Sequence, residues 1–150
     1  MNFESLNISW VLVDEIAVGP APFNDRLLEV LHLNEIKNIL SLCSKDEHKY
    51  KIKNDLFNHE ELILPDHRSE LILEISEVEK ALNILERFKK IGPTYVHCLY
   101  GIERSPLICM AYLIKISGYS FQNALDYMLN IRRSTNPLSE HLKIIKTFES

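Results

Sequence analysis

The 150-residue sequence predicts one α/β domain, in which a central, mostly parallel sheet of about four or five strands carries helices on both faces and forms three layers. Short β-type runs alternate with segments whose apolar residues recur at helical spacing. The helical segments are long enough to cross over between parallel strands. The length suits a single domain, and no internal repeat or low-complexity segment interrupts it, so residues 1–150 are expected to fold together.

Four apolar runs in the first 65 residues have the length and composition of β-strands. The third is the most continuous and predicts a central strand with a largely buried face. Between the second and third runs, from Phe23 to about Leu33, the apolar residues fit a helix. The charged stretch Ser44–Asn54 favours a short helix or turn on a solvated surface. The four runs are Trp10–Val13, Ile16–Val18, Ile36–Cys43 and Glu61–Leu64.

The second half of the chain predicts the longest helix, a fifth strand and three further helices. Apolar residues from Leu71 to Leu85 recur at steps of four and three, so a helix capped by Ser69 is expected to end near Gly92. Thr94–His97 has the character of a strand. The later helices are expected over Pro106–Ile116, which is apolar on nearly all sides, around Phe121–Met128 and around Leu142–Phe148.

The composition, with 46% hydrophobic and 25% charged residues, is that of an ordinary globular protein. A net charge of −4 gives no overall attraction to nucleic acid or to an anionic membrane, so neither is expected as a partner. No apolar stretch approaches the roughly 20 residues of a membrane span, and the N-terminus lacks the pattern of a secretory signal. A soluble, cytoplasmic protein is expected, with a monomer favoured.

Cysteine and histidine give no sign of a metal centre. The three cysteines include no C-x-x-C pair, which argues against a disulfide framework and against a structural zinc site. The histidines are scattered without the spacing of metal ligands. Reduced thiols are expected, and neither a metal nor a cofactor.

The run His97–Ser105, HCLYGIERS, joins a predicted strand to a predicted helix and suits the binding of an anion. Successive backbone N–H groups of such a turn can all point inward, and the start of the helix adds partial positive charge. Gly101 permits the backbone angles that the turn needs. Arg104 can hold two phosphate oxygens with its planar fork. The residues expected to contact an anion are therefore His97, Leu99, Tyr100, Gly101, Ile102, Glu103 and Arg104.

Cys98 is the candidate nucleophile of this loop. A thiol surrounded by N–H dipoles and an arginine loses its proton more readily than a free thiol. The thiolate can attack phosphorus and form a phosphocysteine intermediate. Ser105 could hydrogen-bond the sulfur when water hydrolyses that intermediate, and His97 could tune the loop through a ring nitrogen.

Asp66 is the candidate general acid, because the departing oxygen needs a proton. It directly follows the predicted strand that ends at Leu64, so it should lie at the same edge of the sheet as Cys98. A Pro-Asp pair is also a common turn element. Glu103 or Asp55 therefore remain alternatives, as does a reaction that needs no acid.

The spacing His97-Cys98-x-x-Gly101-x-x-Arg104-Ser105 resembles the signature of the protein tyrosine phosphatase superfamily, and the size of the chain resembles its small dual-specificity branch. Three other segments look like parts of that family: its third strand, its general-acid loop, and its helix, Arg and Pro region. Asp66 and Cys98 are 32 residues apart, which is similar to the small dual-specificity enzymes. The three segments are Ile36–Cys43, Leu64–Asp66 and Ala124–Pro137.

The resemblance implies dephosphorylation of Ser, Thr and Tyr phosphoproteins without a cofactor. Relatives that hydrolyse phosphoinositides typically carry Lys or Arg in the loop, whereas this loop has no basic side chain before Arg104. Highly phosphorylated lipid headgroups are therefore disfavoured. An outward-pointing Glu103 would leave only backbone in the pocket, and Tyr100 could either face a substrate or pack over the sheet edge.

Other residues have two interpretations each. Cys43 matches a position where some superfamily members carry a cysteine that forms a disulfide with the oxidised nucleophile, and it is otherwise a small buried residue. Arg132 and Arg133 could form a second anion pocket, or could cap a helix and pair with carboxylates. Asn136 could face the active site.

Two further functions stay open from the sequence. The same chemistry could act on a non-protein phosphomonoester, such as a nucleotide, an RNA 5′-phosphate, a sugar phosphate or a lipid phosphate. The chain could also be a catalytically silent module that binds phosphate.

Overall fold

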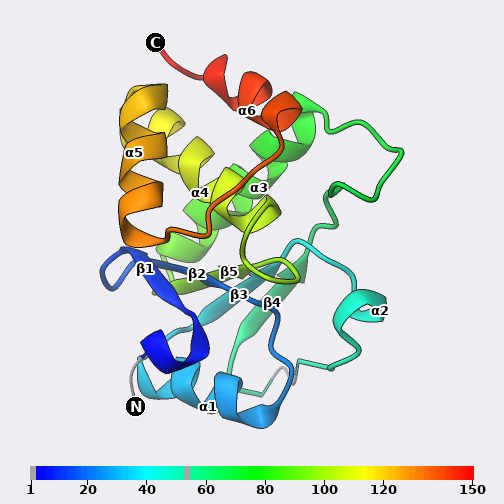
Figure 1. Cartoon of the computed structure of the whole chain (residues 1–150). Coiled ribbons are helices and arrows are strands. Elements are labelled where there is room, and N and C mark those ends of the chain that lie inside the picture. The colour runs from blue at the N-terminus through cyan, green and yellow to red at the C-terminus, as the bar shows by residue number, and fades with distance from the viewer. Residues whose placement is uncertain (1–2, 53–54) are drawn as a thin grey trace.

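A computed structural model of the chain describes residues 3–52 and 55–150, and a five-stranded sheet forms its centre (Figure 1). The strands are β1 (Ser9–Leu12), β2 (Ile16–Gly19), β3 (Asn38–Ser41), β4 (Asn58–Glu61) and β5 (Thr94–His97). Their order is β1-β2-β5-β3-β4. Only the β1–β2 pair is antiparallel within this sheet, and the other three pairs are parallel. The predicted fold class is confirmed.

Helices cover both faces of the sheet. They are the 3-10 helix η1 (Glu4–Leu6) and the α-helices α1 (Asp25–Leu33), α2 (Lys45–His48), α3 (Ile75–Lys89), α4 (Arg104–Lys115), α5 (Phe121–Ile131) and α6 (Ser139–Lys146). α1 lies on one face, while α3 to α6 pack on the other (Figure 1). Among the described residues, none of these helices combines the length and the apolar character that crossing a membrane requires.

The strands β1, β2, β3 and β5 contribute to two hydrophobic cores, because successive side chains point to opposite faces of a sheet. In β5, Tyr95 packs with the α1 core and Val96 with the core under α3 to α6. The same alternation places Ile39 and Leu40 of β3 in different cores. All residues of α4 from Arg104 to Ile114 are buried, which explains why this segment is apolar on nearly all sides.

The fourth strand begins and ends earlier in the chain than predicted. β4 covers Asn58–Glu61, whereas the apolar pattern predicted Glu61–Leu64. β4 is an edge strand with polar side chains, so apolar periodicity does not reveal it. Beyond it, the Leu62 and Leu64 N–H groups still donate to the carbonyls of Ser41 and Leu42, at 2.8 and 3.1 Å.

The longest helix begins later than predicted, at Ile75 instead of just after Ser69. Its N-cap is Glu74, whose N–H donates to the Glu77 carboxylate in a capping box. The Ser69 hydroxyl instead accepts the Leu71 N–H at 3.1 Å and closes a local turn. Ser69–Glu74 therefore forms an irregular connection between α3 and the loop that holds Asp66, which we call the acid loop.

Asn38, at the start of β3, joins three neighbouring elements from a buried position. Its amide nitrogen lies 3.0 Å from the Phe88 carbonyl and 3.1 Å from the Thr94 hydroxyl. Its amide oxygen accepts a hydrogen bond from Asn58 at 3.0 Å. One side chain thus links the end of α3 to β5 and β4, and fixes the amino-terminal edge of the sheet.

Asn38→Ala is expected to lower the free energy of unfolding by about 2 kcal/mol, because it leaves buried polar groups without partners. Urea denaturation followed by circular dichroism measures this change. The control is Asn123→Ala, at an exposed position of α5, which should leave stability nearly unchanged. Equal stabilities of Asn38→Ala and the wild type would contradict the role of Asn38.

Candidate active site

The carboxyl ends of the parallel strands meet at one edge of the sheet, and the candidate residues gather there. Cys98 follows β5 directly, and Asp66 lies five residues beyond the end of β4. The two residues line one cavity of about 250 Å³. The residues that line this cavity come from the two loops and are Asp66–Arg68, Cys98–Tyr100 and Ile102–Arg104.

The backbone carbonyls of the Cys98 loop are all held from outside the loop. In a trans peptide unit the N–H points away from the carbonyl, so these contacts turn the N–H groups of residues 99–103 toward the cavity. This is the nest geometry that binds an oxyanion. The contacts are His97 Nδ1 to Cys98 O, Ala21 N to Leu99 O, Arg132 to Tyr100 O and Gly101 O, and Asn136 N to Ile102 O.

Arg132 is the main support of this loop, and it is not part of a second anion pocket. Its Nε donates to the Gly101 carbonyl at 2.8 Å, and its Nη1 to the Asn7 carbonyl at 2.7 Å. Arg133 is exposed to solvent instead. Neither the anion-pocket interpretation nor the pairing with carboxylates applies to Arg132, whose partners are backbone carbonyls and the Ser9 hydroxyl.

Gly101 is required where Arg132 approaches the loop. Its φ is +69°, a conformation that L side chains rarely adopt. A Cβ at this position would lie 2.5 Å from Arg132 Nη2 and 2.6 Å from the Gly19 backbone. Gly101 therefore lets the loop pack closely against both β2 and Arg132.

His97 lies beneath the loop and does not line the cavity, so its predicted contact with an anion is wrong. Its Nδ1 donates to the Cys98 carbonyl at 2.9 Å, which requires the proton on Nδ1. In the neutral ring, Nε2 then accepts the Ser41 hydroxyl, whose oxygen lies 2.6 Å away. His97 orients the first peptide of the loop through these two bonds.

Cys98 is buried at the bottom of the cavity, where its Sγ lies 3.2 Å from the Ser105 hydroxyl. Burial alone would raise the pKa of this thiol. Hydrogen bonds from Ser105 and from the Gly101 N–H, together with the charge of Arg104, outweigh burial and lower the pKa. Cys98 is therefore more easily ionised than a free cysteine, as a nucleophile requires.

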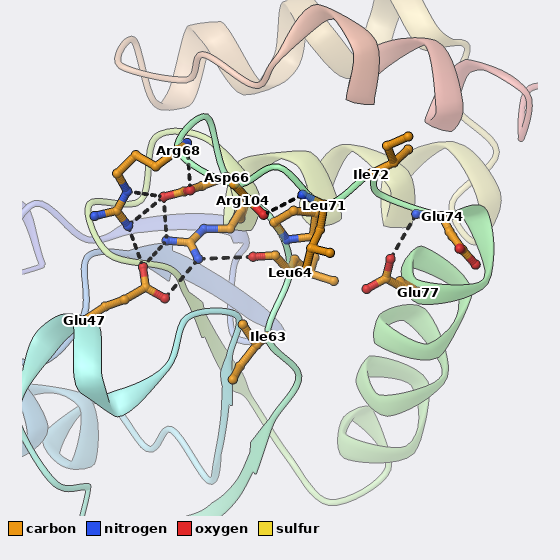
Figure 2. A pocket seen from close by; sticks show the side chains of 12 residues that line it. Glu47, Ile63, Leu64, Asp66, Arg68, Leu71, Ile72, Glu74, Glu77 and Arg104 are labelled. Carbon is orange, nitrogen blue, oxygen red and sulfur yellow. Dashed lines mark hydrogen bonds and ion pairs between the residues drawn. The ribbon is translucent and has the colours of Figure 1, made fainter.

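Arg104 is held by a carboxylate that the sequence did not reveal as part of the site. Glu47 Oε1 lies 3.0 Å from Arg104 Nη2 (Figure 2). The stretch Ser44–Asn54 was predicted as a solvated surface, which is wrong for Glu47, while residues 53–54 lie outside the described part. A sequence signal does exist, because Ser44 and Glu47 form the capping box that begins α2.

One nitrogen of Arg104 is left for a ligand. Nη1 donates to the carbonyls of Leu42 and Leu64, at 3.3 and 3.2 Å, but the buried Nε has no hydrogen-bond partner among the described residues. A buried N–H without a partner costs free energy. An anion bound in the loop would supply the missing acceptor.

Asp66 lies between two arginines in the same network (Figure 2). Its carboxylate is 2.7 Å from Arg68 Nη2 and 3.7 Å from Arg104 Nη2, and it also accepts the Arg68 N–H at 3.0 Å. Burial raises the pKa of the Asp66 carboxyl, but these hydrogen bonds and charges outweigh burial and hold the pKa below its ordinary value.

Glu103 points toward the acid loop and lines the cavity, so the expectation of an outward side chain is wrong. Its Oε1 lies 2.6 Å from His67 Nδ1, and its Oε2 accepts the His67 N–H at 3.2 Å. The Cys98 loop and the acid loop are thereby joined directly. Tyr100 stands at the rim with 60% of its surface exposed, and Asn136 reaches the loop through its backbone N–H.

The fold brings together three side chains that could ligate a metal, which the spacing of the histidines did not indicate. One ligand atom from each of Asp66, His67 and Glu103 lies within 4.8 Å of the others. The Asp66 carboxylate is already paired with Arg68, and His67 with Glu103. These existing pairs account for the cluster without an ion.

Cys43 lies beside His97, with its Sγ 3.9 Å from Nδ1. Burial raises the pKa of the Cys43 thiol to about 12, so it is protonated in this state. Cys43, Cys98 and Cys109 are all free thiols. A disulfide between Cys43 and an oxidised Cys98 stays a prediction.

Known proteins resemble the chain in sequence. A family model described as the dual specificity phosphatase catalytic domain matches residues 21–150. Dual specificity protein phosphatase 5 of Homo sapiens is 38% identical over 63 residues, which cover 41% of this chain and 16% of that protein. A probable dual specificity protein phosphatase of Dictyostelium discoideum is 28% identical over 137 residues, 88% of this chain and 46% of that protein. The chain spans less than half the length of these curated relatives.

Solved structures resemble its fold. The crystal structure of PTPMT1 in complex with PI(5)P has a TM-score of 0.81 at 15% identity and covers 95% of this chain and 94% of that chain. The structure of DUSP15 has a TM-score of 0.79 at 20% identity and covers 94% and 86%. The family model covers most of the chain, including the whole Cys98 loop. The chain therefore belongs to the dual specificity phosphatase catalytic domain family.

Proposed function

We propose that this domain hydrolyses phosphomonoesters of phosphoproteins, with Cys98 as the nucleophile. The observation that carries the proposal is the Cys98 loop itself. The carbonyls of residues 98 to 102 are held outward, which turns the backbone N–H groups toward the Cys98 thiol, whose pKa is lowered. The buried Arg104 Nε also finds no acceptor among the described residues. A phosphate group fits these donors and faces the sulfur.

The first step transfers the phosphoryl group to sulfur. The Cys98 thiolate attacks phosphorus, the P–O bond to the leaving group breaks, and Asp66 donates a proton to the departing oxygen. Asp66 must be protonated for this step. A phosphate dianion on Arg104 would favour that form, because it offsets the arginine charge and adds negative charge beside the carboxyl.

The second step releases inorganic phosphate. Water attacks phosphorus, Asp66 accepts a proton from that water, and the S–P bond breaks to regenerate the thiolate. Ser105, at 3.2 Å from the sulfur, stabilises the departing thiolate with its hydroxyl proton.

The side chains around the cavity favour a phosphoprotein. The relatives include a phosphoglucan phosphatase of Castanea sativa, and a structural neighbour binds PI(5)P, so the family alone does not set the substrate. In this chain, the loop residues between Cys98 and Arg104 include no cation. Glu103 adds a carboxylate at the cavity wall. Additional phosphates of a lipid or glucan would be repelled there.

Cys98→Ser is expected to reduce hydrolysis of para-nitrophenyl phosphate and of phosphopeptides by more than roughly a thousandfold, because it removes the nucleophile. Binding of inorganic phosphate, measured by calorimetry, should persist. The control Cys109→Ala removes another buried thiol, outside the cavity, and should stay active. A wild-type protein that binds phosphate or vanadate but hydrolyses none of these substrates would be a silent binding module.

Asp66→Asn tests the general acid. Hydrolysis of substrates with poor leaving groups should fall about a hundredfold, while the best aryl leaving groups should lose much less. Rates across a series of aryl and alkyl phosphates measure this dependence. Asp126→Asn, on the remote helix α5, serves as the control. A uniform loss for all leaving groups would contradict the assignment.

Arg68→Gln should extend activity to higher pH. Arg68 helps hold the pKa of Asp66 low, and a general acid works only below its own pKa. Without the guanidinium, the Asp66 pKa rises and the alkaline limb of the kcat profile moves upward. Rates measured between pH 4 and 8 check this, with Arg87→Gln, which removes a surface arginine paired with Glu60, as the control. An unchanged limb would show that Arg68 does not tune the acid.

A further inference from the structure

A second, larger hollow of about 570 Å³ adjoins the catalytic cavity. Asp66, Arg68 and Arg104 line both spaces, so the hollow, which we call the groove, lies directly beside the catalytic cavity. In Figure 2 this groove extends from Arg104 past Leu71 toward Glu74 and Glu77. If the Cys98 loop binds the phosphate of a substrate, the portion of the substrate next to that phosphate would therefore lie beside the groove.

One wall of the groove is apolar and faces solvent. Leu73 is only 2% exposed and anchors the connection between the acid loop and α3 in the core. Its neighbours Leu71 and Ile72 are 78% and 83% exposed, and both line the groove together with the half-exposed Ile63. Contiguous aliphatic surface left in water is typical of an interaction site, because burial would be favourable.

The far end of the groove is acidic. Glu74 and Glu77 line it, and their side chains form the capping box of α3, which fixes both carboxylates in place. In the described lining, the basic side chains are Arg68 and Arg104 at the catalytic end, where each is paired with a carboxylate. At this end, the described lining of the groove offers a ligand two carboxylates and no basic side chain.

We propose that this groove binds the polypeptide on one side of the phosphorylated residue and selects an aliphatic side chain followed by a basic one. The aliphatic side chain covers Leu71 and Ile72, and the basic side chain pairs with Glu74 and Glu77. The proposal rests on the proposed function, because the phosphate site fixes the position of the peptide. Charge favours a peptide over an anionic lipid surface, which the same carboxylates repel.

The test compares three phosphotyrosine peptides of otherwise identical sequence. One lacks the pair, one carries Leu and then Arg after the phosphotyrosine, and one carries Arg and then Leu before it. In both peptides with the pair, Leu lies nearer the phosphotyrosine and both residues lie within four positions of it. In the wild type, the pair should raise kcat/KM about tenfold on one of the two sides. Leu71→Ser/Ile72→Ser should abolish most of this gain. Hydrolysis of para-nitrophenyl phosphate, which is too small to reach the groove, should change less than about twofold because the catalytic residues are intact.

A second variant tests the acidic end. Glu74→Gln/Glu77→Gln keeps the hydrogen-bond acceptors of the capping box but removes both charges, so it should abolish the preference for Arg over Gln in the peptide. The matched controls are Ile91→Ser, another exposed aliphatic residue at 55%, and Glu86→Gln, on the same helix outside the groove. Both controls should keep the wild-type preferences.

Several outcomes would overturn the proposal. Full activity on para-nitrophenyl phosphate with no gain from the Leu-Arg pair on either side would leave the phosphatase function standing and remove the groove from substrate selection. If Leu71→Ser/Ile72→Ser lost activity only on phosphoinositide vesicles, the surface would be assigned to membrane binding. If the variant changed its oligomeric state, the surface would be assigned to contact with a second copy of the chain. A wild type inactive on every phosphomonoester would refute the proposed function, and the selection with it.

Discussion

The geometry of the site depends on how the carbonyls of the Cys98 loop are anchored. Each N–H can face an anion only if the carbonyl of the preceding residue points away and finds a partner there. Arg132 supplies two of these contacts from beyond α5, and backbone N–H groups of Ala21 and Asn136 supply two more. The candidate anion site is thus held in shape by Ala21, Arg132 and Asn136, which do not themselves line the cavity.

A second constraint is the alternation of charge around Arg104. Glu47 and Asp66 lie on either side of it, and Arg68 contacts both carboxylates. Such a network restrains the guanidinium in an orientation that leaves Nε without a partner among the described residues, and it also holds Asp66 beside the candidate phosphate site. The orientation of Arg104 and the pKa of Asp66 are coupled, because Arg68 and Arg104 both act on the Asp66 carboxylate.

The same short acid loop separates two surfaces of different character. On one side, His67 and Glu103 join it to the Cys98 loop over the catalytic cavity. On the other side, the connection to α3 exposes Leu71 and Ile72 above an acidic end. The loop that holds Asp66 therefore borders both the candidate catalytic cavity and the groove that we propose to select the polypeptide.

The sequence by itself determined the α/β class and the order of most elements, and it singled out Cys98, Arg104 and Asp66, which the fold brings to one cavity. Apolar periodicity and the spacing from Cys98 to Arg104 are local patterns, and local patterns can be recognised in the sequence without knowledge of the fold. The edge strand β4 was misplaced because its residues are polar and show no apolar pattern. The start of α3 was misplaced because Leu71 continues the helical spacing although it is exposed and precedes the helix. Only the tertiary structure revealed the roles of Glu47, Arg132 and Glu103, since each contacts its partner across the fold and a charged residue carries no signal of the partner it will meet.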